Sequence, residues 1–360
     1  MKQYLHFPKG NGSYTVAENL ARNANTKLWA IGDYSSGLYI DGTFPVLFSH
    51  PKSSGKRFAD LSQPEYWEYY NNLSKALASE PKDLAIVHHG FAIAKILGKK
   101  QPVVSYLHGT EMLAFKHVPE YIKQDVYDGL SLSKKVLVMS EKQKDMALDM
   151  FQHVLRCDVE VLSGGIDTDI FHPYDTLTKI KQLYSLNPDK KMILFAGRLT
   201  TEKNLDVLVD AFDTEFSSDK QLVIVGSGSR SGDLSSYARD KDVHFISALP
   251  QKELAQLMSA ADVFVLPSTY ESFGLVVLEA IASGTPVVAS DVGILKQLID
   301  PPNGGEVFSL NNSSVDNLKS SIDKALCLDT QTFKEYSYSI RSGYSWEGVA
   351  KRFVHLVKNI

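Results

Sequence analysis

The sequence has little of several features that mark particular classes of protein. It contains two cysteines, Cys157 and Cys327, among 360 residues, which are too few for a disulfide framework or a cysteine zinc cage. No run approaches the ~18 consecutive apolar residues of a membrane-spanning helix. The N-terminal segment MKQYLHFPKGNGSY has no apolar stretch of signal-peptide length. We therefore expect free thiols, no membrane span and a cytoplasmic location.

An excess of positive charge is also missing. The 38 Lys and Arg residues are outnumbered by 42 Asp and Glu residues, which gives a formal charge of −4. Proteins that bind nucleic acid through its phosphates usually carry a basic excess. We expect no nucleic-acid partner and, at a membrane, at most peripheral contact. The 44% of hydrophobic and 22% of charged residues are typical of a globular chain, with length for about two domains.

Apolar runs alternate with helical patterns along the whole chain. Continuous Val, Ile and Leu runs are typical of parallel strands that are covered on both faces. Their alternation with helices implies right-handed crossovers and doubly wound sheets. The first series of predicted strands is 27–31, 85–88, 103–107, 135–139 and 159–162, and the second is 191–196, 221–225, 243–246, 263–266 and 286–289. The predicted helices include 14–22, 204–212, 252–259, 275–282 and 346–360.

The two series of strands predict an α/β protein with two Rossmann-like domains. The boundary is expected near Phe171-His172-Pro173, because a proline follows the first series there. We assign residues 1–172 to an N-terminal domain, 173–344 to a C-terminal domain and 345–360 to a final amphipathic helix.

The turn after the strand 191–196 carries two cations. It reads GRLTTEKN, residues 197–204, and open α/β sheets bind ligands at the carboxyl ends of their strands. Gly197 leaves space beside the backbone, and Arg198 and Lys203 can place two positive charges on one anion. The alternative is a solvated loop with ordinary surface cations.

A second turn, residues 267–275, reads PSTYESFGL and begins a helix. Free N–H groups at such a helix N-terminus can bind an anion. Glu271 lies before the helix and Glu279 two turns into it, and this spacing separates them by about 80° around the axis, so both can face one ligand. Glu271 is otherwise explained as an acid favoured by the helix dipole. Glu279 lies in an apolar stretch and is harder to explain as a surface residue.

The first half of the chain offers weaker candidates. The turn KGNGS, residues 9–13, joins the first strand to a helix; Gly12 can let the backbone approach a phosphate, and Ser13 can cap the helix. His108, in LHGTE, follows a strand and is well placed to reach a ligand. His88 and His89 also end a strand, and we interpret them as structural.

Two other motifs are interpreted as structural. VGSGS, residues 225–229, resembles the start of a dinucleotide fingerprint, but Ser231 stands where a third glycine belongs. No ribose-binding acid follows in a clean βαβ unit, so we do not expect NAD. Asp167 and Asp169 could suggest a metal-binding pair, but they lie in the connection to the predicted domain boundary. We interpret them as part of a hinge, and we expect neither a metal nor a cofactor.

Taken together, these motifs resemble the retaining GT-B glycosyltransferases of family 4. The resemblance covers most of the chain and is strongest from about 160 to 300. It is carried by LSGGIDTDIFHP (162–173), GRLTTEKN (197–204), VGSGS (225–229) and ADVFVLPSTYESFGLVVLEAIASGTPVVAS (261–290).

The resemblance implies a fold and a reaction. The fold would be two Rossmann-like domains facing across a cleft, with the last helix crossing back onto the first domain. The enzyme would move a sugar from a nucleotide-diphosphate sugar, UDP favoured and GDP possible, to an acceptor hydroxyl without a metal. A role in the biosynthesis of cell-surface polysaccharides or glycoconjugates would follow.

The resemblance also assigns residue roles. Arg198 and Lys203 would hold the diphosphate, and Glu279 would bind the ribose hydroxyls. Gly12 would approach the donor phosphate, and His108 would contact the sugar near the reacting carbon. The catalytic set would be His108, Glu271, Arg198 and Lys203. The donor-binding set would be Gly12, Arg198, Lys203, Glu271, Ser272, Phe273, Gly274, Leu275 and Glu279.

The N-terminal half departs from the family pattern. Its glycine turn reads GNGS rather than a Gly-Gly pair, and residues 50–77 have no family counterpart that we can align. Acceptors of this family usually bind the N-terminal domain. The acceptor is therefore left open among glycans, lipid-linked sugars, proteins and small molecules.

Two other functions compete with sugar transfer. The first is a glycoside hydrolase with Glu271 and Glu279 as its carboxylates. Eight helical positions rise ~12 Å, whereas such carboxyl pairs lie ~5–9.5 Å apart, although long side chains can converge. The second is a non-catalytic module that binds a nucleotide sugar on the same fold.

Overall fold

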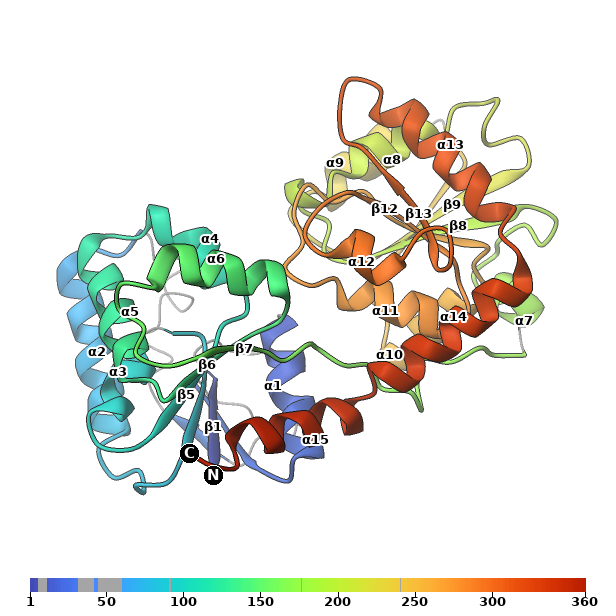
Figure 1. Ribbon diagram of the computed structural model, residues 1–360. Helices are drawn as coiled ribbons and strands as arrows, with labels where there is room; N and C mark the ends of the chain where they lie inside the picture. The colour runs from blue at the N-terminus through green and yellow to red at the C-terminus, as the bar shows by residue number, and fades with distance from the viewer. Residues whose placement is uncertain (6–11, 32–41, 45–59, 91, 176, 240) are drawn as a thin grey trace. The chain divides into compact units, whose positions relative to one another are not determined.

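A computed structural model gives the structure of the chain (Figure 1). It describes residues 1–360 except for 6–11, 32–41, 45–59, 91, 176 and 240. The chain divides into two units. Unit 1 comprises Met1–Gly164 and Trp346–Ile360, and unit 2 comprises Gly165–Ser345.

Unit 1 contains a seven-stranded sheet in the order β3-β2-β1-β4-β5-β6-β7, with parallel pairing throughout. The chain moves outward in one direction from β1 to β3 and in the other from β4 to β7, so the strand order reverses between β1 and β4. The strands are β1 (Lys2–Leu5), β2 (Lys27–Ile31), β3 (Gly42–Phe44), β4 (Ala85–His88), β5 (Val103–Tyr106), β6 (Lys135–Val138) and β7 (Val159–Val161).

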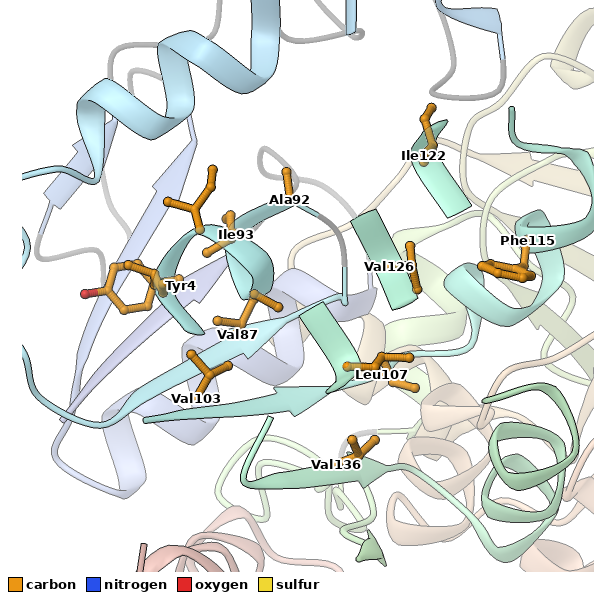
Figure 2. Close-up of a cluster of buried hydrophobic side chains, with 14 of the residues drawn as sticks. Tyr4, Val87, Ala92, Ile93, Val103, Leu107, Phe115, Ile122, Val126 and Val136 are labelled. Atoms are coloured by element: carbon orange, nitrogen blue, oxygen red, sulfur yellow. The ribbon is translucent and has the colours of Figure 1, made fainter. Parts of the chain in front are cut away.

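Helices cover both faces of this sheet, because alternate side chains of a strand point to opposite faces. Tyr4 belongs to the larger core cluster and Leu5 to a smaller one under α1. Figure 2 shows part of the larger cluster, with Val87 on a strand and Ile93 and Val126 on helices. The helices of unit 1 are α1 (Gly12–Asn23), α2 (Gln63–Ala76), α3 (Ala92–Gly98), α4 (Thr110–Ala114), α5 (Glu120–Leu132), α6 (Glu141–Phe151) and α15 (Trp346–Val357).

Unit 2 repeats this architecture with six parallel strands in the order β10-β9-β8-β11-β12-β13. The strand order reverses between β8 and β11. The strands are β8 (Lys191–Ala196), β9 (Lys220–Val225), β10 (Val243–Ile246), β11 (Val263–Leu266), β12 (Val287–Ser290) and β13 (Gly305–Phe308). The helices are α7 (Leu177–Leu183), α8 (Leu205–Ala211), α9 (Ser231–Tyr237), α10 (Gln251–Ala260), α11 (Leu275–Ala282), α12 (Leu295–Ile299), α13 (Ser314–Leu326) and α14 (Thr330–Gly343).

The predicted fold class, an α/β chain with two Rossmann-like parallel sheets, is confirmed. Every predicted strand is present to within a residue at either end. β1 was expected as the strand before the turn 9–13, but without a range. The predicted series omitted β3 and β13, which have three and four residues. Both begin with glycine, and neither forms the continuous apolar run that identified the others. Within the segment 50–77, the structure describes residues 60–77, which include α2.

The units meet in the sequence at Gly164/Gly165 and Ser345/Trp346, whereas we expected boundaries at 172/173 and 344/345. The first boundary lies earlier because the chain joins unit 2 before the proline is reached. Ile166 forms a bridge with Ser345, and its N–H donates to the carbonyl of Tyr344 at 2.8 Å. At the other end, α15 lies beside α1 in unit 1 (Figure 1).

The described parts of the chain hold no helix with both the length and the apolar character needed to cross a membrane. Cys157 and Cys327 are free thiols, as expected.

The VGSGS motif lets two loops of unit 2 pack backbone against backbone. The N–H of Gly197 donates to Val225 and that of Leu199 to Ser227, each at 3.0 Å, which extends the β8–β9 pairing beyond the strands. A Cβ on Gly226 would lie 1.9 Å from the Gly197 carbonyl oxygen, and one on Gly228 would lie 2.3 Å from that of Leu199. These glycines are therefore explained by the close approach of the loop 197–199.

We predict that Gly226→Ala destabilises the protein by about 1–3 kcal/mol, because the methyl group meets backbone that cannot yield without breaking the loop pairing. The backbone φ of Gly226 is +142°, which adds strain for any other residue. Gly232→Ala is the matched control, since a Cβ at this position in α9 meets nothing within 4 Å. It should leave stability unchanged or raise it by up to ~1 kcal/mol. Equal melting temperatures for the two variants would contradict the packing argument.

Candidate functional site

The candidate site in unit 2 lies where the strand order reverses. β8 and β11 are neighbours in the sheet, and the loops 197–204 and 267–274 follow them at the same edge. Thr269 joins the two loops, because its N–H donates to the carbonyl oxygen of Glu202 at 2.9 Å. The point of reversal in an open parallel sheet is where side loops diverge and a ligand can enter between them. The fold thus brings the two predicted motifs together.

An ion pair links the two loops. Nζ of Lys203 lies 2.5 Å from Oε1 of Glu271, and the hydroxyl of Ser268 donates to the same oxygen at 2.8 Å. The exposed fractions of the two charged side chains are only 15% and 12%. Asn204, with φ of 51°, then turns the chain into α8. The short 3₁₀ turn Thr201–Lys203 therefore holds the lysine at the opposite loop.

Arg198 behaves differently from Lys203. Its side chain is 69% exposed, and its nearest acidic group, Glu202 Oε1, lies 4.0 Å away. A pair this long and exposed contributes little to stability. The guanidinium is therefore available to an incoming anion at the same edge of the sheet.

The N-terminus of α11 has backbone donors and no side-chain cap from the described part of the chain. Gly274 is its N-cap residue, with φ of 90°, and a Cβ there would lie 2.5 Å from Cδ2 of Leu295. Ser272 and Phe273 precede it, and Leu275 is the first helical residue. The first N–H groups of an α-helix have no partner within the helix and favour an anion. The predicted donor-binding segment therefore has the backbone chemistry expected of it.

Glu279 lies in α11 and is partly buried. Its carboxylate makes no hydrogen bond or ion pair with any residue that the structure describes. Desolvation raises the pKa of Glu279 to about 7 from an ordinary value of 4.5. A partly buried acid without partners costs stability and is typical of a site built for a ligand.

In unit 1, His108 belongs to a chain of buried polar groups that spans three neighbouring strands. Its Nε2 lies 2.9 Å from Nδ1 of His88, and Nε2 of His88 lies 2.7 Å from Oε1 of Gln3. The amide of Gln3 donates to the hydroxyl of Thr26 at 2.6 Å. Burial, with His89 next in importance, lowers the pKa of His88 to about 3, and burial also lowers that of His108. Both imidazoles are therefore neutral.

His89 and Glu111 form a second buried pair beside His108. Nδ1 of His89 lies 2.7 Å from Oε1 of Glu111, with exposed fractions of 1% and 0%. Glu111 also accepts the backbone N–H of His108 at 3.2 Å. His89 has φ of 73°, an unusual conformation for a residue other than glycine. This pair fixes the turn that carries His108.

The remaining candidates are placed as follows. Gly12 begins α1, so Ser13 is in the first turn of the helix and not at its N-cap as expected. Residues 9–11 of the glycine turn lie outside the described residues. Oδ1 of Asp167 accepts the N–H of Asp169 at 3.1 Å, which forms a local turn. Within the described ranges, no three His, Cys, Asp or Glu side chains are grouped as metal ligands.

Sequence reasoning missed several residues that support the site. Ser268 and Glu111 bind the key side chains of the two units, but both stood in the quoted motifs without an assigned role. Gln3 and His88 are linked to His108 across the sheet, and no pattern along the chain signals this contact. The strand order, once known, would have pointed to them.

The chain is similar in sequence to known glycosyltransferases. The family described as "Glycosyl transferases group 1" matches residues 178–342. An uncharacterized glycosyltransferase of Methanocaldococcus jannaschii is 31% identical over 287 residues, which cover 72% of this chain and 70% of that protein. A D-inositol 3-phosphate glycosyltransferase of Corynebacterium aurimucosum is 37% identical over 172 residues, and only 41% of its length is covered.

Solved structures show the same architecture. Sucrose-phosphate synthase from Thermosynechococcus elongatus has a TM-score of 0.77 at 19% identity, covering 100% of this chain and 99% of that one. Anabaena HepE, in complex with UDP and glucose, has a TM-score of 0.74 at 16% identity, covering 100% of both chains. The expected GT-B class is thus confirmed.

We predict that Glu279→Gln stabilises the protein above pH 7 and has little effect near pH 4.5. An acid with a raised pKa binds more protons folded than unfolded, so its ionisation reduces stability as the pH rises from about 4.5 to 7. Removing the ionisable group should restore about 1–3 kcal/mol at pH 8. Melting curves from pH 4.5 to 8 measure this difference. Glu215→Gln, at an exposed position of unit 2, should show no such divergence, and parallel curves for Glu279→Gln would contradict the prediction.

Proposed function

The chain belongs to the group 1 glycosyl transferases, and we propose that it moves a sugar from a nucleotide-diphosphate sugar to an acceptor hydroxyl with retention of anomeric configuration. The observation that carries this proposal is the cluster at the carboxyl edge of β8 and β11. It combines the Lys203–Glu271 pair, the exposed Arg198 and the uncapped N-terminus of α11. Such a cluster has groups for a diphosphate and for sugar hydroxyls.

The diphosphate would be held by Arg198 and Lys203 together with the N–H groups of residues 272–275. Negative charge develops on this leaving group as the glycosidic bond breaks. Fixed cations and oriented N–H groups stabilise that charge without having to reorganise. This built-in positive charge is our reason for proposing that the reaction needs no metal.

The ribose and sugar hydroxyls would be bound by carboxylates. Glu279, which has no described partner, would accept from the ribose, and Glu271 would accept from the donor sugar. In unit 1, Gly12 would approach the donor phosphate and His108 would contact the sugar near the reacting carbon. UDP is favoured as the carrier, and a neighbour of the same fold, HepE, has been solved with UDP and glucose.

The proposed step forms a bond between the acceptor oxygen and the anomeric carbon. It breaks the bond from that carbon to the diphosphate oxygen on the same face of the sugar. The acceptor proton passes to the departing diphosphate, so the chain needs no separate base. Glu271 and His108 would position the sugar for this front-face attack, and Arg198 and Lys203 would stabilise the product.

The acceptor would be a glycan, a lipid-linked sugar, a protein or a small molecule. The reaction would belong to the assembly of surface glycans in the cytoplasm. Family membership supports transfer over the hydrolase that Glu271 and Glu279 would form. Binding without turnover remains the competing function. A thermal-shift screen of nucleotide sugars, followed by mass spectrometry of products, would identify the donor and test turnover.

We predict that Arg198→Ala and Lys203→Ala each lower turnover by about 10²–10³-fold, because each removes a fixed charge from the leaving diphosphate. Release of the nucleoside diphosphate measures the rate. Lys191→Ala is the matched control, since Lys191 is an exposed lysine at the opposite end of β8 that pairs with Asp262 at 2.9 Å. Near-native turnover in both site variants would contradict the assignment of Arg198 and Lys203 to the donor site.

We also predict that the product keeps the donor's anomeric configuration and that turnover continues in excess EDTA. NMR of the isolated glycoside reads the configuration directly. An inverted centre would exclude the proposed front-face step. Loss of activity on chelation, restored by Mg²⁺ or Mn²⁺, would show that the charge of Arg198 and Lys203 is not sufficient.

A further inference from the structure

The buried chain through Gln3, His88 and His108 has a defined direction of hydrogen bonding. Gln3 donates through its Nε2 to Thr26, so its Oε1 faces Nε2 of His88 at 2.7 Å. A carbonyl oxygen can only accept. The proton of the neutral His88 ring must therefore lie on Nε2, which leaves Nδ1 of His88 without a proton.

The same reasoning continues to His108. The bare Nδ1 of His88 lies 2.9 Å from Nε2 of His108 and can only accept, so Nε2 of His108 carries the proton. Nδ1 of His108 is then a bare acceptor. This atom is buried and has no hydrogen-bond partner among the described residues. A buried acceptor without a partner is costly and indicates a group kept for a ligand.

We propose that Gln3 and His88 are positioning residues that hold His108 as its Nε2–H tautomer, so that Nδ1 accepts a hydrogen bond from a hydroxyl of the donor sugar. The identification of the ligand as a donor sugar rests on the proposed function. The tautomer itself follows from the contacts alone. In the other tautomer of His108, Nδ1 would carry a proton, so it could not accept a hydrogen bond from the sugar hydroxyl.

Burial, with the neighbouring histidines next in importance, lowers the pKa of His108 and keeps its ring neutral. His88 and His89 face His108, with ring centroids 5.2 and 4.8 Å away, and Tyr106 stacks on it at 4.7 Å. Glu111, the acid in this cluster, binds the backbone N–H of His108 and the ring of His89, not the ring of His108. His108 therefore acts through hydrogen bonding and not as a proton acceptor in the reaction.

Nitrogen-15 NMR of the full chain with labelled histidine tests the tautomer without a ligand. We expect both His88 and His108 to show protonated Nε2 and bare Nδ1, unchanged between pH 5.5 and 8. A protonated Nδ1 on His108 would overturn the proposal.

Two variants of His88 then link the tautomer to turnover. His88→Asn can place a carbonyl oxygen near the position of Nδ1 and should keep the tautomer, with turnover within about threefold of native. His88→Leu cannot accept, so both tautomers of His108 should appear and turnover should fall by about five- to tenfold, the value of one neutral hydrogen bond. Gln3→Met, which removes the acceptor for His88, provides the same test if His88→Leu does not fold.

A series of monodeoxy donors identifies the hydroxyl. One member should bind more weakly than the full donor to the native chain, and His88→Leu should remove that difference. Equal losses in both proteins, or native turnover in His88→Leu and Gln3→Met, would overturn the positioning role. A native chain that shows the expected tautomers but transfers no sugar would contradict the proposed function and not the tautomer.

Discussion

The geometry of a parallel sheet determines where chemistry can occur in this chain. After each strand the chain must return to the same end of the sheet before the next parallel strand begins. Every loop from a strand to the following helix therefore lies at one edge of the sheet. Where the strand order reverses, consecutive crossovers cover opposite faces, and the two loops at that point diverge. In unit 2 this point lies between β8 and β11, and in unit 1 between β1 and β4. Glu279 and His108, whose pKa values are shifted by burial, lie beside these two points.

Both units keep polar groups in partly or fully buried positions there. Glu279 has a raised pKa and no described partner, and the buried Nδ1 of His108 has no hydrogen-bond partner among the residues that the structure describes. Each costs stability in the absence of a ligand. Surrounding structure tolerates the cost, because most side chains of the strands beneath these positions are buried apolar groups. The cores thus support sites that are individually unfavourable.

Much of this could be predicted from the sequence. Long Val, Ile and Leu runs identified the strands, and GRLTTEKN and PSTYESFGL indicated the loops that carry Lys203 and Glu271. The direct pairing of those two side chains could not be predicted, because they lie 68 residues apart and their contact depends on the order of β8 and β11. His88 was interpreted as structural for a similar reason. Its partners lie on β1 and after β5, and only the sheet brings the three together.

The ion pair between Lys203 and Glu271 also affects which ligands can bind to Lys203. A small free anion that bound to Lys203, such as inorganic phosphate, would have to separate the pair, leaving Glu271 with the hydroxyl of Ser268 but without its cation. A ligand that carries both a phosphate and hydroxyl groups offers a new partner to each side chain at once. The pair therefore sets a condition that two chemical groups must satisfy together. A phosphate group alone would meet only half of this condition, so an anion without hydroxyl groups would gain less from binding to Lys203 than a ligand that carries both groups.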